Sequence, residues 1–130
     1  DLLMLVEEEG VLFTGDIVVA GRIPYVVDAD VGAWLAAIER LAGYPAKILV
    51  TGHGTHSVDA ARDVQMTRDY LRFLREAMRK AVRDGVDFEQ AYRDTNWAPY
   101  DKLPAFQDAN RKNAFGAYLA AEQESLGKLE

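Results

Sequence analysis

The sequence predicts an α/β protein: a mixed β-sheet that carries its helices on one face, followed by further C-terminal helices. Two short apolar runs near the N-terminus, joined by a charged turn, are typical of a β-hairpin. A third such run, Lys47–Thr51, follows a helical segment, and a strand reached through a helix usually pairs in parallel. The C-terminal half repeats its apolar residues every three or four positions, which indicates helices.

The hairpin is expected from Leu2–Val6 and Val11–Thr14, with Glu7–Gly10 as the turn between them. Ile17–Ala20 continues the second apolar run past Gly15-Asp16, so β structure is expected there as well. Because the chain opens within a predicted strand, we expect it to be part of a longer protein.

A loop over residues 21–30 contains Pro24 and leads into a helix that Asp28 or Asp30 can cap. That helix is predicted from apolar residues at helical spacing, namely Trp34, Ala37, Ile38 and Leu41. Gly43 and Pro45 end it, and the third strand follows.

The C-terminal half is predicted to be mainly helical. A long helix over residues 60–83, capped by Ser57 or Asp59, has one apolar stripe made of Val64, Thr67, Leu71, Leu74, Met78 and Ala81. A short helix at 87–93 and a loop at 95–104 come next. The last helix is marked by Phe106, Ala109, Asn113, Ala117, Tyr118 and Ala121.

Composition limits the possible functions. The chain has 130 residues, of which 49% are hydrophobic, enough for a single domain with a core. A net charge of -6 repels phosphate backbones, so we expect no nucleic-acid partner. No apolar run approaches the roughly 20 residues of a membrane span, so no membrane partner is expected. The absence of cysteine excludes disulfides and thiolate chemistry but leaves the cytoplasm and the periplasm both open.

Two polar residues stand where apolar runs end. Asp16 follows Phe13-Thr14-Gly15, and His53 lies between two glycines after Val50-Thr51. Either could have a purely structural role, as a turn aspartate or helix cap in one case and a packed histidine in the other. Both leave strands of parallel type at the same end, where α/β sheets place their sites. A carboxylate and an imidazole suit zinc, iron or manganese. His56 is expected at the surface or outside the ligand set.

These motifs resemble a known family. Phe13-Thr14-Gly15-Asp16, then a helix containing Trp34-Leu35, then Gly52-His53-Gly54 and a long helix resemble the C-terminal half of the metallo-β-lactamase superfamily. The resemblance covers roughly residues 1–74. It implies half of an αββα sandwich, and 1–130 would then be one partial domain, with the sheet and ligand loops in 1–57 and mainly helices in 58–126.

The resemblance also implies a metal centre. Asp16 would bridge two zinc ions, with iron or manganese as alternatives, and His53 would complete the second site. The protein as a whole would be a metallohydrolase whose metal-bound hydroxide attacks an ester, thioester, amide or phosphoester. The family's HxHxDH motif does not occur in this chain. We therefore expect the chain alone to be inactive and not to bind metal stably.

The implied partners follow from the same resemblance. A small-molecule substrate would meet Arg22 and Tyr25 in the loop after Asp16, with the Arg22 guanidinium gripping an anionic group. We also expect a homo-oligomer, or pairing with the N-terminal half, through the uncovered face of the sheet. Two alternatives stay open: an iron-dependent oxygenase of the same fold, and a non-catalytic protein-interaction module whose Gly-Asp and Gly-His-Gly are only turns.

Overall fold

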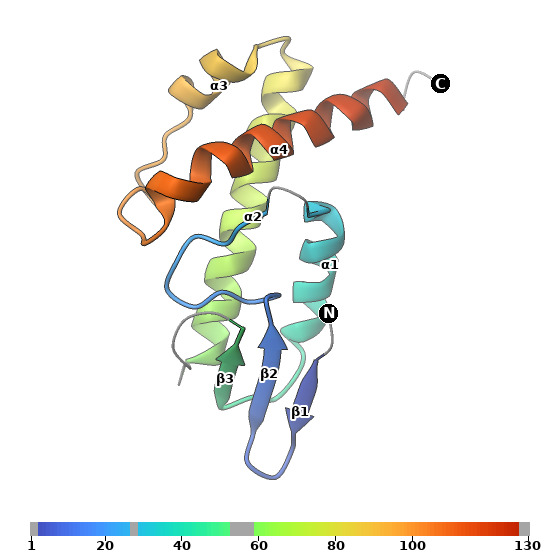
Figure 1. The fold of residues 1–130 in the computed structure, drawn as a ribbon. Coiled ribbons are helices and arrows are strands. Elements are labelled where there is room, and N and C mark those ends of the chain that lie inside the picture. The colour runs from blue at the N-terminus through green and yellow to red at the C-terminus, as the bar shows by residue number, and fades with distance from the viewer. Residues whose placement is uncertain (1–2, 27–28, 53–58, 128–130) are drawn as a thin grey trace.

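The computed structural model describes residues 3–26, 29–52 and 59–127. Strands β1 (Met4–Val6), β2 (Val11–Gly15) and β3 (Ile48–Thr51) form a sheet in the order β1-β2-β3. β1 pairs with β2 in antiparallel fashion, and β2 pairs with β3 in parallel (Figure 1). The expected mixed sheet is thereby confirmed, including the hairpin and the parallel strand that follows a helix.

Helices account for most of the remaining chain. They are α1 (Val31–Leu41), α2 (Ala60–Arg83), α3 (Phe88–Asp94) and α4 (Phe106–Gly127). Each lies within a few residues of the predicted range. Within the described ranges, no helix is both long and apolar enough to cross a membrane.

Aspartates begin three of these helices. The side chains of Asp30, Asp59 and Asp87 accept hydrogen bonds from backbone N–H groups in the first turns of α1, α2 and α3. Such caps satisfy N–H groups that have no partner inside the helix. Of the predicted alternatives, Asp28 and Ser57 lie outside the described residues.

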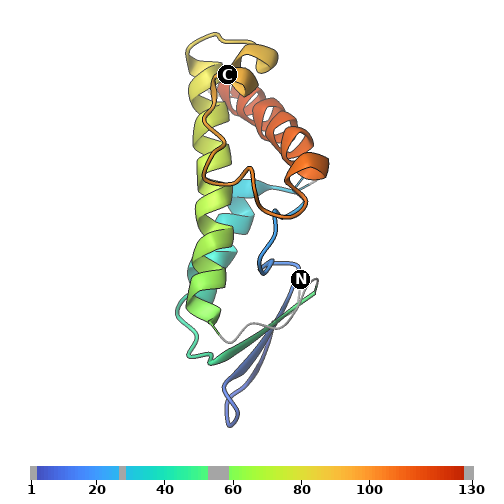
Figure 2. The same ribbon diagram turned by 90° about the vertical axis from the view of Figure 1, so that its left-hand side faces the viewer.

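Helices α1 and α2 cover one face of the sheet (Figure 2). Leu12 of β2 and Leu49 of β3 point to that face and are buried. Their neighbours Val11 and Phe13, which alternate to the opposite face, are only partly buried. The sheet thus has one covered face and one apolar face that these helices leave open.

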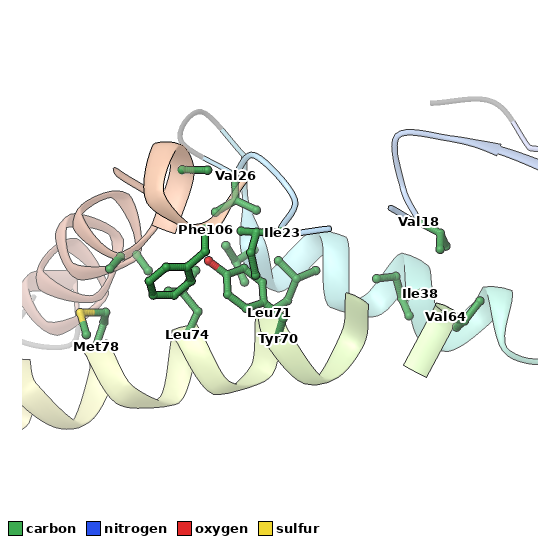
Figure 3. Close-up of a cluster of buried hydrophobic side chains, with 14 of the residues drawn as sticks. Val18, Ile23, Val26, Ile38, Val64, Tyr70, Leu71, Leu74, Met78 and Phe106 are labelled. Carbon is green, nitrogen blue, oxygen red and sulfur yellow. The ribbon is translucent and has the colours of Figure 1, made fainter. Parts of the chain in front are cut away.

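The core continues away from the sheet along α2. Its predicted stripe from Val64 to Ala81 is buried, and α4 packs across the C-terminal part of α2 (Figures 1 and 3). Ile23 and Val26 of the loop after β2 lie against Tyr70 and Leu71 of α2 (Figure 3). One continuous core therefore joins the sheet helices, the loop and the C-terminal helices.

The expected β structure at Ile17–Ala20 is wrong. β2 ends at Gly15, and the following residues form turns and a loop. Val18 and Val19 are nevertheless buried, at 0% and 7% exposure. The apolar run therefore reflects burial of a loop under the helices, which a pattern of hydrophobicity alone cannot distinguish from a strand.

Candidate functional site

A tight turn at the end of β2 presents Asp16. The Ile17 N–H donates to the Thr14 carbonyl at 3.3 Å, and Gly15 between them has a φ of 55°. That left-handed conformation favours glycine because it has no Cβ. Asp16 is exposed at the tip of this turn, at the carboxyl end of β2. The glycine that precedes Asp16 is therefore what lets the buried strand deliver a carboxylate to its end.

The Asp16 carboxylate lies against the end of the neighbouring parallel strand. The Gly52 N–H, just past β3, donates to the Gly15 carbonyl at 2.7 Å. A Cβ at Gly52 would overlap Asp16 Oδ1 and would lie 3.0 Å from the Gly15 carbonyl carbon. A larger residue at position 52 would therefore have to displace the Asp16 carboxylate and crowd the Gly15 backbone. The two strand ends that the motifs mark thus meet, with the carboxylate of one lying on the backbone of the other.

The predictions for the two histidines fall outside the structure. His53 follows Gly52 directly in the sequence, but His53 and His56 both lie outside the described residues. The metal roles of Asp16 and His53 therefore stay predictions. Zinc in a catalytic site usually takes three protein ligands. Among residues 3–26, 29–52 and 59–127 no group of three potential ligands gathers closely enough to hold a metal ion. Of the donors that a metal site here would need, the described residues supply the Asp16 carboxylate. The remaining donors would have to come from residues that the structure does not describe or from another part of the protein.

Asp16, Arg22 and Tyr25 line one surface pocket, whose other walls are Val19, Ile23, Pro24 and Trp34. Arg22 is exposed and Tyr25 is 60% exposed. The pocket offers a carboxylate, a guanidinium, a phenol and an indole within one hollow. Their roles toward metal and substrate remain predictions, but the fold does bring these three predicted side chains together.

Helices α1 and α2 fix the chain that follows Asp16. The Trp34 indole N–H of α1 donates to the Ile17 carbonyl at 2.6 Å. The Thr67 hydroxyl of α2 accepts from the Val19 N–H and donates to the Val19 carbonyl, each at 3.2 Å. The sequence marked Trp34 and Thr67 only as helix-face residues. The signal for Thr67 was present, since a hydroxyl within an apolar stripe needs a hydrogen-bond partner.

A second pocket lies between the sheet, the end of α1 and the start of α2. It is lined largely by apolar side chains such as Leu12, Leu41 and Val64, and of the lining residues that the structure describes, only Arg68 is charged. Among the described residues that line it, none is an acid or a histidine that could serve as a ligand or base. The pocket at Asp16 is therefore the better candidate for chemistry.

Part of the chain is similar in sequence to a known family. Residues 3–53 match the family model described as the metallo-beta-lactamase superfamily, a span that ends at His53. A search of curated protein sequences found no match.

Among solved structures, the chain is similar to a metallo-beta-lactamase family protein from Thermus thermophilus. The two share 22% identity with a TM-score of 0.59, and the similarity covers 92% of this chain but 37% of that protein. The chain therefore spans only about a third of the length of the protein it matches, and at this identity the likeness shows the fold alone. The chain thus shares its fold with a metallo-beta-lactamase family protein, and its residues 3–53 are similar to the metallo-beta-lactamase superfamily model.

Proposed function

We propose that this chain contributes Asp16 and His53 to the metal site of a metal-dependent hydrolase that acts on an ester, thioester, amide or phosphoester. The observation that carries the proposal is the meeting of the two strand ends, where Gly52 leaves room for the Asp16 carboxylate immediately before His53 in the sequence. A bound zinc ion would supply a Lewis acid and lower the pKa of a water molecule to about 7.

The chain's own groups would bind and orient the substrate. Arg22 is exposed on the wall of the same pocket as Asp16, where its planar guanidinium can pair with a carboxylate or phosphate group of the substrate. Tyr25 and Trp34 add a phenol and an aromatic wall beside it. We therefore propose small, anionic substrates, with the choice among the hydrolysable bonds left to groups outside these residues.

The partner proposal concerns the open face of the sheet. The outward-facing side chains stand in two rows across the strands, Met4–Phe13–Val50 and Val6–Val11–Ile48. Met4 is 53% and Val6 36% exposed. Exposed apolar surface that is contiguous usually marks an interface. We propose that this face packs against a second copy of the chain or against a further β layer.

Metal analysis of the purified gene product tests the function. Without added metal during purification, we expect zinc, iron or manganese in stoichiometric amount, reduced strongly by Asp16→Ala and by His53→Ala. Asp69→Ala, which removes a partly exposed acid of α2, is the matched control and should retain the metal. A metal-free wild type, or equal metal in all variants, would sink the proposal and favour the non-catalytic module.

The identity of the metal separates the two enzymatic hypotheses. Stoichiometric zinc with hydrolysis of p-nitrophenyl esters supports the hydrolase, whereas iron with substrate-dependent oxygen uptake would replace it with the oxygenase. For the 130-residue chain by itself we expect no measurable hydrolysis. Activity of the chain alone that Asp16→Ala abolishes would contradict the expectation that further ligands are essential.

A further inference from the structure

The loop at 17–26 has no regular secondary structure, yet hydrogen bonds from buried side chains and from the backbone before α4 hold it in place. Besides Thr67 at Val19, the Ile23 N–H donates to the Pro104 carbonyl at 3.0 Å, in the segment just before α4. The loop carries Arg22 and Tyr25 and leads away from Asp16. Its conformation therefore depends on groups far along the chain.

Asn113 of α4 makes the most specific of these contacts. Its Oδ1 accepts from the Val26 N–H at 2.9 Å, and its Nδ2 donates to the Pro24 carbonyl at 2.7 Å. These backbone groups stand on the two sides of Tyr25. One side-chain amide thus pairs with the loop much as a neighbouring strand would, and it is completely buried, at 0% exposure.

A chain of hydrogen bonds fixes which way the Asn113 amide points. Its Nδ2 also donates to the Tyr70 hydroxyl at 3.1 Å, which donates to Asn110 Oδ1 at 2.8 Å. Asn110 Nδ2 in turn donates to the Tyr92 hydroxyl at 3.1 Å. Burial raises the pKa of the Tyr70 phenol, so its proton stays available for Asn110. Turning the Asn113 amide over would set donor against donor at Val26 and acceptor against acceptor at Pro24.

The contact has a consequence at the pocket surface. Ile23 and Val26 point inward to Tyr70 and Leu71 (Figure 3), whereas Tyr25 between Pro24 and Val26 is 60% exposed and lines the pocket with Asp16. Since the backbone is clamped on both sides of Tyr25, the direction in which its phenol leaves the loop is set from α4.

We propose that Asn113 is a positioning residue: it sets the place of Tyr25, and with it Arg22, in the Asp16 pocket, so that helix α4 governs which anionic substrates fit. The inference rests on the proposed function of that pocket. It assigns to α4, which contributes no wall to the pocket, control of substrate binding rather than of the metal-dependent step.

Amide hydrogen exchange of the chain by NMR tests the clamp without any need for activity. Asn113→Ala should lower the protection factor of the Val26 amide by roughly tenfold or more beyond the change at Leu71, which reports opening of the core. Ala121→Gly destabilises the same helix at a buried position away from the loop. This control should lower the protection factors of the Val26 and Leu71 amides by similar amounts. If Asn113→Ala also lowered the protection factors of Val26 and Leu71 by similar amounts, Asn113 would have only a structural role and the proposal would be overturned.

Asn113→Asp provides a second variant with a readout that a merely structural role would not move. A buried carboxyl group has a raised pKa, and when protonated it can still accept from Val26 and donate to Pro24. The protection of Val26 relative to that of Leu71 should therefore recover in this variant as the pH falls from about 8 to about 5. Protection that does not change with pH, after correction for the intrinsic exchange rate, would contradict the clamp.

Kinetics of the metal-loaded gene product test the consequence for substrates. Asn113→Asp at a pH of about 8 should raise KM for p-nitrophenyl succinate, which carries a carboxylate, several-fold more than KM for neutral p-nitrophenyl acetate, with kcat changed less than about twofold. Equal KM changes for the two esters would overturn the specificity role. If the wild type hydrolyses neither ester, the proposed function fails, and the exchange data still decide whether Asn113 positions Tyr25.

Discussion

At the scale of single residues, the site depends on two glycines at which a larger residue would strain the backbone or displace a neighbouring group. Gly15 adopts a left-handed conformation, and a Cβ at Gly52 would overlap Asp16 Oδ1 where that carboxylate now lies. Gly15 of the GD motif and Gly52 of the GHG motif therefore have a steric role in this chain, whatever the motifs contribute to metal binding.

Gly52→Ala should therefore displace the Asp16 carboxylate. Because the added methyl group overlaps a carboxylate oxygen and approaches the Gly15 backbone, we expect the free energy of unfolding to fall by about 1–3 kcal/mol, together with loss of bound metal from the gene product. Urea unfolding and metal analysis measure the two effects. Gly43→Ala is the control, since its Cβ would meet nothing closer than 3.5 Å. A Gly52→Ala protein as stable as the control would show that no such overlap exists.

Tyr70 gives the protein a predictable response to alkali. Burial holds the pKa of its phenol above the usual value of 10.0. The folded state thus keeps a proton that the unfolded state releases, and this contribution to stability is complete below a pH of about 10 and lost as the pH rises through the folded-state pKa. Above a pH of about 10 the free energy of unfolding should fall with pH, by at most about 1.4 kcal/mol per pH unit from this group.

Tyr70→Phe should flatten that alkaline decline. It should also cost about 1–3 kcal/mol near neutral pH, because Asn110 Oδ1 loses its donor in the core. Urea unfolding from neutral pH to a pH of about 11 measures both effects, with Tyr44→Phe, at an exposed position, as the control. An alkaline slope as steep in Tyr70→Phe as in the wild type would contradict the assignment to Tyr70.

At the scale of elements, α1 links the sheet to the site. Asp30 caps its first turn by accepting from the Ala33 N–H at 3.0 Å, and one turn later Trp34 donates to Ile17, the residue after Asp16. Destabilising the first turn of α1 should therefore weaken the hydrogen bond from Trp34 to Ile17, next to the turn that carries Asp16.

Asp30→Ala should lower the free energy of unfolding by about 0.5–2 kcal/mol, the usual cost of losing such a cap. In this variant we also expect faster exchange of the Trp34 indole N–H, whose bond to Ile17 depends on the first turns of α1. Asp30→Asn retains an accepting oxygen and should stay close to the wild type in both measurements. Equal stability of the alanine and asparagine variants would indicate that the cap does not support α1.

The same elements show how far sequence reasoning reaches. The hairpin, the parallel strand and the four helices follow from local periodicity and from caps and breakers, which act within a few residues. The prediction for Ile17–Ala20 was wrong because burial of a loop by α2 looks the same in sequence as a strand. The role of Asn113 could not be predicted, since its partners at Pro24 and Val26 are fixed only when α4 docks on α2.

At the scale of the whole molecule, some parts of the site could be predicted from the sequence and others depend on how the chain folds. The position of Asp16 next to Gly52 was predictable, because both motifs follow parallel strands at the same end of the sheet. The convergence of Asp16, Arg22 and Tyr25 on one pocket depends on the path of the loop, and that path is set by α1, α2 and α4 together. A site in this chain is therefore a product of its C-terminal helices as much as of its sheet.

The open face of the sheet leads to a prediction about assembly. Residues such as Phe13 and Val11 on β2 alternate with buried Leu12, and they form apolar rows with β1 and β3 that no described helix covers. Burial of such surface drives association, because apolar area removed from water stabilises a complex. In solution, the 130-residue chain should therefore self-associate in a concentration-dependent way through this face.

Phe13→Lys should shift the chain toward monomer, because a lysine ammonium at the centre of the face would have to lose its hydration in the interface. Sedimentation velocity over a range of concentrations measures the shift, and circular dichroism checks that the fold is kept. Ser125→Lys adds the same charge at an exposed position of α4 and should associate like the wild type. A wild-type chain that stays monomeric at every concentration, or a Phe13→Lys chain that associates equally well, would show that this face does not mediate assembly of the chain with itself.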